Sequence, residues 1–225
     1  MNRYAPELAL ITGGLLGTVF GGFVLVSVGE FYSAALVCVL FGYPFAAYAI
    51  HTDDEPTTVL PPRAVTTVAG LAAIGVIADV LRLFAPSVDS LLIGILVALV
   101  VFLPVAAYAT QHGTPPAWLG RRLVEAGGTL LAAGLLGGGL VSGAAAPAAA
   151  SAVAVFLATM LFAARSTGVS PRRRRLVPVG GVVVAAGLLA VGSVSGGPLD
   201  PWVTTALGAV FAPLLYIALA TSGRS

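Results

Sequence analysis

The residues best suited to chemistry are an acid and a base inside an apolar stretch. Asp79 and Arg82 lie in the segment ADVLRLFA, near the end of a hydrophobic run over 65–85. Their spacing of three residues places them on one face of a helix, where they can pair. In a membrane helix such residues often mark a proton or ion pathway. The alternative is a neutralised pair whose arginine reaches the nearby membrane surface, because Asp79 lies only ~9 Å from the end of the run.

A second group of candidates consists of prolines inside apolar stretches and the tyrosines near them. A proline in a helix removes a backbone donor and frees the carbonyl four residues earlier. Such carbonyls can coordinate a cation in transporters with broken helices, or a neighbouring hydroxyl can satisfy them at a simple kink. The tyrosines either line a path for an amphipathic solute or belong to an interfacial aromatic belt. The prolines are Pro44, Pro104 and Pro213, and the tyrosines are Tyr48, Tyr108 and Tyr216.

Several other chemistries lack the residues that they need. Cys38 is the only cysteine, so the chain has no pair of cysteines for a disulfide, zinc or iron–sulfur site. No phosphate-binding loop and no His-Glu-x-x-His motif is present. His51 precedes the acidic residues at 53–55, but their spacing matches no ligand pattern, so we expect a solvated acidic loop. The sequence therefore predicts no enzyme, no cofactor and no metal site.

The elements that must position these residues are eight apolar stretches, each near the roughly 20 residues that span a bilayer. With 58% hydrophobic and 9% charged residues, the chain has too little polar surface for a soluble globule. The absence of lysine and the abundance of Ala, Gly and Val resemble the composition of proteins from halophilic archaea. We predict an all-α, polytopic transmembrane bundle with spans near 8–28, 32–50, 65–85, 90–109, 123–143, 147–164, 176–195 and 202–220.

The distribution of basic residues predicts the orientation in the membrane. All eleven are arginines, and all except Arg82 lie at the termini or near the loops that follow even-numbered spans. The positive-inside rule then places both termini in the cytoplasm, and we expect the protein in the cell membrane. Four successive arginines in one such loop favour contact with anionic lipid headgroups over nucleic acid. They are Arg172, Arg173, Arg174 and Arg175.

The chain also repeats itself. RLVEAGGTLLAAGLLGGGLVSG begins at Arg122, and RLVPVGGVVVAAGLLAVGSVSG begins 53 residues later at Arg175. Similarity at a fixed period marks a repeat architecture. We therefore predict a single membrane domain of four two-helix hairpins over 1–56, 57–115, 116–170 and 171–225. Because each unit crosses the membrane twice, successive copies must be parallel in topology.

Glycines concentrate in the odd-numbered spans, several of them four residues apart. Small residues at this spacing let helix backbones approach closely, which matters because lipid provides no hydrophobic drive for association. We predict a packing role for Gly13, Gly17, Gly21, Gly127, Gly128, Gly134, Gly180, Gly181 and Gly187.

Two functional classes are compatible with these features. The first is a small permease for an ion or an amphipathic solute, with Asp79 as coupling residue, and the recurring prolines favour it slightly. The second is a non-transporting module that scaffolds a protein partner, binds lipid or supports assembly, including self-association. Few charged or amide groups lie inside the spans, which counts against transport of a polar solute.

Overall fold

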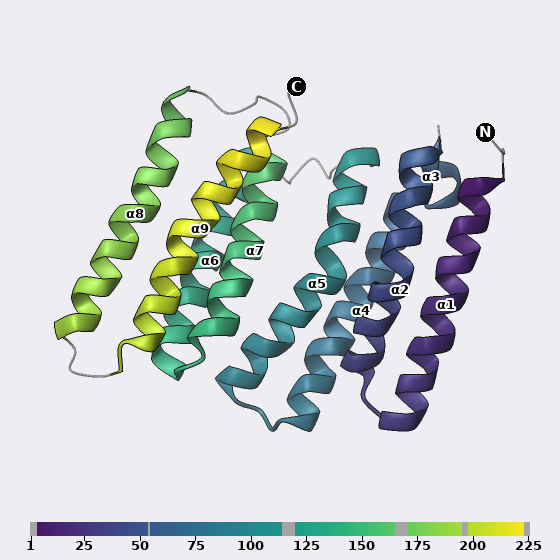
Figure 1. Cartoon of the computed structure of the whole chain (residues 1–225), viewed down its shortest axis with the longest axis horizontal. Coiled ribbons are helices and arrows are strands. Elements are labelled where there is room, and N and C mark those ends of the chain that lie inside the picture. The colour runs from purple at the N-terminus through teal and green to yellow at the C-terminus, as the bar shows by residue number, and fades with distance from the viewer. Residues whose placement is uncertain (1–3, 54, 114–119, 165–170, 195–197, 223–225) are drawn as a thin grey trace. The chain divides into compact units, whose positions relative to one another are not determined.

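A computed structural model of the chain describes residues 4–53, 55–113, 120–164, 171–194 and 198–222, and their secondary structure is helical (Figure 1). Short connections join the helices, and one of them contains a single helical turn, α3, that the sequence did not predict. The helices are α1 (Ala5–Val28), α2 (Phe31–Thr52), α3 (Pro56–Val59), α4 (Pro62–Leu83), α5 (Val88–His112), α6 (Arg121–Ser142), α7 (Ala145–Ala164), α8 (Pro171–Val194) and α9 (Asp200–Ser222).

In the described part of the chain, seven helices are long and apolar enough to cross a membrane: α1, α2 and α4 to α8. Charged residues are rare in their apolar segments, as a hydrocarbon environment requires. The protein is therefore a multi-pass membrane protein with an all-α fold, as predicted. The eighth predicted span, 202–220, coincides with α9, whose side chains beyond Tyr216 lie outside the described residues. That crossing stays a prediction.

The chain divides into two compact units. The first contains Met1–Ala85 and Val97–Thr114, and the second contains Pro86–Leu96 and Pro115–Ser225. The break after Thr114 falls beside the predicted boundary between the second and third hairpins. The fourfold repeat itself stays a prediction.

The core of the first unit lies among α2, α4 and α5. Ala35, Val76, Ala98 and Val101 are buried there, and partly buried side chains from the same three helices surround them. Phe31 packs its ring over Gly75 of α4, where an added Cβ would lie 2.9 Å from Phe31 Cε1. Small residues thus allow α2 and α4 to meet closely, and this contact holds the beginning of α2 against α4.

In the same unit, α1 and α2 pack along the glycine series predicted from the sequence. A Cβ on Gly13 would lie 2.6 Å from Phe45 Cβ, and one on Gly17 would lie 3.2 Å from the Cys38 carbonyl oxygen. A Cβ on Gly21 would overlap Cys38 Sγ. The Cys38 thiol donates a hydrogen bond to the Gly17 carbonyl oxygen at 3.1 Å. The two helix backbones therefore approach as closely as the absence of side chains permits.

The second unit contains two hairpins, α6–α7 and α8–α9, with matching glycine contacts. Gly128 faces Thr159 of α7, and its counterpart 53 residues later, Gly181, faces α9. A Cβ on Gly181 would lie 2.6 Å from the Ala209 carbonyl oxygen and 2.7 Å from Pro213 Cγ. Further along the two hairpins, Gly139 faces Ala148 and Gly192 faces Trp202 in the same way. Within each hairpin, the two helices thus pack against each other at equivalent glycines.

Four of the nine predicted packing glycines take no part in such contacts. They are exposed, and a Cβ on any of them would meet nothing within 4 Å among the described residues. Successive residues in a helix are turned by about 100°, so the neighbour of a packed glycine points elsewhere. This rotation explains the exposure of Gly127 beside Gly128 and of Gly180 beside Gly181. The four exposed residues are Gly127, Gly134, Gly180 and Gly187.

Candidate functional site

The surroundings of α4 determine how Asp79 and Arg82 are exposed. Val76 and Val80, on the side of α4 that faces the core, have no exposed surface. The Asp79 side chain lies beside them and is only 8% exposed, whereas the Arg82 side chain is 64% exposed. The pair therefore spans the edge of the packed region, with the carboxylate inside and the guanidinium largely outside.

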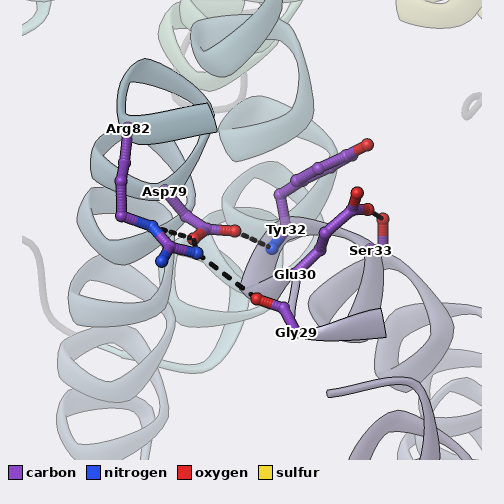
Figure 2. A network of polar contacts seen from close by, with 6 residues as sticks. All are labelled: Gly29, Glu30, Tyr32, Ser33, Asp79 and Arg82. Carbon is purple, nitrogen blue, oxygen red and sulfur yellow. Dashed lines mark hydrogen bonds and ion pairs between the residues drawn. The ribbon is translucent and has the colours of Figure 1, made fainter. Parts of the chain in front are cut away.

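The Asp79 carboxylate accepts hydrogen bonds through both oxygens (Figure 2). Oδ1 accepts from Arg82 Nη2 at 2.7 Å and from Arg82 Nε at 3.2 Å. Oδ2 accepts from the backbone N–H of Tyr32 at 3.0 Å. The Asp79 carboxylate thus joins α4 to the first turn of α2. The bond is made to the Tyr32 N–H, which has no carbonyl partner within its own helix.

Arg82 extends this network to the end of α1. Gly29 follows α1 with φ +78°, in the left-handed region, and its N–H bonds back to the Leu25 carbonyl oxygen. Its own carbonyl oxygen accepts a hydrogen bond from Arg82 Nη2 at 3.3 Å. The anion therefore sits at the start of α2 and the cation at the end of α1, which is the favourable charge at each helix terminus.

Glu30 lies in this turn yet does not cap α2 with its side chain. Its carboxylate instead accepts a hydrogen bond from Ser33 Oγ at 2.6 Å. Asp79 takes over the capping position from 47 residues away in the sequence. The Tyr32 ring also meets the Phe84 ring edge-on, with the centroids 6.1 Å apart. We define Gly29, Tyr32, Asp79 and Arg82 as the turn clamp.

The sequence pattern indicates the acid and the base of the turn clamp but neither of its backbone groups. Every residue except proline has the same backbone N–H and carbonyl groups, so the amino-acid types of Tyr32 and Gly29 do not indicate that their backbone atoms bind Asp79 and Arg82. The one available signal was Gly29 itself, since a glycine directly after an apolar helix often adopts the left-handed conformation that ends it.

Pro44 and Tyr48 line an open apolar groove between α1 and α2. The groove has a volume of about 570 Å³, and its remaining lining residues are Ala5, Leu8, Ala9, Thr12 and Phe45. Tyr48 is 51% exposed at this place. Of the predicted path-lining residues in the first unit, Pro44 and Tyr48 are the two that share this groove.

At the other two prolines, nearby carbonyl groups contact a neighbouring helix. The Tyr43 hydroxyl of α2 donates a hydrogen bond to the carbonyl oxygen of Val101, in the turn of α5 before Pro104. In the second unit, Pro213 frees the carbonyl of Ala209, and this oxygen lies against Gly181 of α8. Both sets of contacts are those of helix packing.

The remaining tyrosines are buried in different surroundings. Tyr108 is 7% exposed, and its hydroxyl donates to the carbonyl oxygen of Leu60 at 2.6 Å. Tyr216 is 3% exposed and packs edge-on against Phe156, with the ring centroids 6.5 Å apart. Neither lies at an open surface where a belt residue or a path-lining residue would contact lipid or solute.

The polar loop residues form no metal site in the part of the chain that the structure describes. No three His, Cys, Asp or Glu side chains gather there as metal binding would require. Asp53 Oδ1 accepts a hydrogen bond from the Glu55 N–H at 3.1 Å, which is a local turn contact. Asp54 lies outside the described residues, as do the side chains of the four predicted lipid-binding arginines, Arg172 to Arg175.

No family model, curated protein or solved structure matches this chain. What the protein does must therefore be inferred from its membrane helices and from the turn clamp. The clamp can fix the angle and register of three helices because it combines one ion pair with hydrogen bonds to two helix ends. Proton or ion exchange would require its carboxylate to release these partners.

Proposed function

We propose that this protein is a non-enzymatic, non-transporting membrane module that presents its helical surface to lipid or to a protein partner. The observation that carries this proposal is the engagement of Asp79, whose two oxygens bond to Arg82 and to the start of α2. An acid inside a membrane helix is the usual mark of a transport pathway. Here that acid has a structural task that accounts for its cost.

A coupling role would work against this arrangement. Protonation of Asp79 would remove the negative charge that Arg82 and the N-terminus of α2 both attract. Each transport cycle would thus break the clamp that holds α1, α2 and α4 together. A structural role needs no such cycle, and the 8% exposure of the carboxylate suits it.

A second candidate, a permease for a small amphipathic solute, is favoured by the groove beside Pro44. Its lining is apolar except for Thr12 and Tyr48, and it is open to the surface of the first unit. A proline inside a membrane helix can interrupt its hydrogen bonding, and interrupted helices form the substrate sites of many transporters. Its described lining residues include no acidic or basic side chain, however, so they offer no charged group for coupling transport to an ion.

In the proposed setting, the module lies in the cell membrane with both termini in the cytoplasm. This orientation rests on the arginine-rich loops after even-numbered spans. We propose that the four arginines from Arg172 to Arg175 contact anionic headgroups there. A protein partner or a second copy of the chain would bind in the membrane plane, and no nucleic acid is involved.

Flux measurements on proteoliposomes test the proposal against the permease. The wild-type protein and the Asp79→Asn variant are reconstituted with a pH-sensitive dye or a sodium-sensitive dye inside the vesicles. The module proposal expects no proton or sodium flux above that of protein-free vesicles for either protein. Wild-type flux that disappears in a normally folded Asp79→Asn variant would overturn it and establish a coupling role.

Isolation from native membranes tests whether the protein binds a partner chain, lipid or further copies of itself. The protein is extracted under mild conditions, and the stoichiometry of the complex is measured by native mass spectrometry. A module is expected to be recovered with a fixed number of partner chains, of retained lipids or of copies of itself. Repeated recovery as a bare monomer without bound lipid would contradict the proposal.

A further inference from the structure

The connection between α2 and α4 folds back on itself to form a compact segment, Glu55–Pro61, which contains α3. The Leu60 N–H bonds to the Pro56 carbonyl oxygen at 2.9 Å, and the Thr58 N–H bonds to the Glu55 carbonyl oxygen at 3.2 Å. Thr58 Oγ1 also donates to the Glu55 carbonyl oxygen at 2.8 Å. A single helical turn is not stable by itself, because nucleation costs more than one or two hydrogen bonds return. Something outside the segment must hold it.

Tyr108 of α5 supplies that contact. Its hydroxyl lies 2.6 Å from the carbonyl oxygen of Leu60, which follows α3, and 3.2 Å from that of Pro56, which begins α3. The Tyr108 side chain is buried, and its ring packs on His112 one helical turn later, with the centroids 4.9 Å apart. One phenol therefore bridges both ends of the short helix.

We infer that Glu55–Pro61 is a strap closed over the end of α5 and that the Tyr108 hydroxyl is its latch. After release of this one hydroxyl, water can satisfy the Leu60 carbonyl oxygen, and the Pro56 carbonyl oxygen keeps its bond from the Leu60 N–H. Opening would also expose the Tyr108 hydroxyl. A segment with so few anchoring bonds belongs to the low-stability end of a structure, where local opening occurs without global unfolding.

Tyr48 provides a matched control for Tyr108. Tyr48 follows Pro44 by four residues, just as Tyr108 follows Pro104. Tyr48 is nevertheless 51% exposed, and its hydroxyl makes no hydrogen bond to another described residue. The two tyrosines follow a proline at the same spacing, but only the Tyr108 hydroxyl is bonded to the strap. Removal of the hydroxyl should therefore matter at Tyr108 and not at Tyr48.

Hydrogen–deuterium exchange on the full-length protein in nanodiscs tests this inference. We expect the wild-type amides of Thr58 and Leu60 to exchange at least about tenfold more slowly than in an unstructured peptide. In the Tyr108→Phe variant, exchange in the strap should accelerate by about two- to tenfold, the equivalent of one lost hydrogen bond. Exchange in α1, α2 and α4 should not change. Tyr48→Phe should leave every segment at wild-type rates.

Three results would overturn the inference. Wild-type strap amides that exchange at unstructured rates would show that the strap is not held closed, and this result needs no variant. Unchanged strap exchange in folded Tyr108→Phe protein would show that the hydroxyl is not the latch. Acceleration spread evenly over the strap and the long helices would assign Tyr108 a general packing role. The inference is independent of whether the protein is a module or a permease.

Discussion

The α1–α2 hairpin is held in two different ways at two places along its length. At its turn, charged and backbone groups meet in the turn clamp, and Asp79 and Arg82 reach it from α4. Along its middle, Gly13, Gly17 and Gly21 have no side chains, and the backbone of α1 approaches α2 closely at these three positions. The first region depends on a few directional bonds, and the second depends on the absence of atoms.

This difference predicts how each region responds to change. Close packing has little tolerance for added volume, because a new Cβ would meet backbone or the inner part of a side chain. A hydrogen-bonded clamp loses one bond at a time, and water or the polar headgroup region can replace part of the loss at its exposed side. Glycine sites should therefore be the more sensitive of the two, and the clamp should respond in graded steps.

The largest effect is expected at a packed glycine in the second unit. Gly181→Leu would push a side chain against the Ala209 carbonyl oxygen and Pro213, which cannot move aside without displacing α9. We expect a loss of about 3 kcal/mol in the free energy of unfolding. The matched control is Gly180→Leu, whose side chain would enter open space and cost no more than about 0.5 kcal/mol. Denaturant titration in mild detergent measures both, and equal losses would refute the packing difference.

Removal of the acid of the turn clamp should have the next largest effect. Asp79→Ala leaves the Tyr32 N–H without its acceptor and leaves the Arg82 guanidinium with only the Gly29 carbonyl oxygen, for an expected loss of about 2 kcal/mol. Asp79→Asn keeps an oxygen for the Tyr32 N–H and should lose roughly half as much. The same titration measures both variants. If the alanine variant were as stable as wild type, the clamp would not hold the turn.

A smaller effect is expected for the hydrogen bond between α2 and α5. Tyr43→Phe removes the donor to the Val101 carbonyl oxygen and keeps the ring in place. Hydrogen bonds between membrane helices contribute about 0.6 kcal/mol on average, so the loss should be of this size. Double-mutant analysis with Asp79→Ala should give additive losses, because the two sites share no partner. A coupling above about 0.5 kcal/mol would show that the mid-helix contact and the turn clamp act as one unit.

The smallest effect should follow loss of the base of the turn clamp. Arg82 is 64% exposed, so its attraction to Asp79 is screened, and Arg82→Gln should cost about 0.5 kcal/mol. Added salt should weaken the wild-type protein slightly more than the variant, since screening acts on the ion pair. Melting temperatures at low and high salt check this. A loss as large as that of Asp79→Ala would mean that the arginine, not the contact to α2, carries the clamp.

Sequence patterns predicted part of the turn clamp and part of the glycine packing. The pairing of Asp79 with Arg82 follows from their spacing on one helix, so it needed no tertiary information. The partners from α1 and α2 did need it, because Gly29 and Tyr32 act through backbone atoms. The glycine series in α1 was predicted in full because its spacing of four keeps one face. Adjacent glycines such as Gly180 and Gly181 could not be told apart, since each has a glycine counterpart 53 residues earlier in the sequence.

The sequence by itself determined that this is an all-α protein of the membrane, because the length and hydropathy of a span are local properties of the chain. Tertiary structure alone decided what each polar or small residue does there. Tyr48 and Tyr108 occupy the same position after a proline, yet one is exposed in a groove and the other is buried beneath α3. Hydrogen-bond partners and close contacts depend on distances between helices, and no local pattern of residue types encodes those distances.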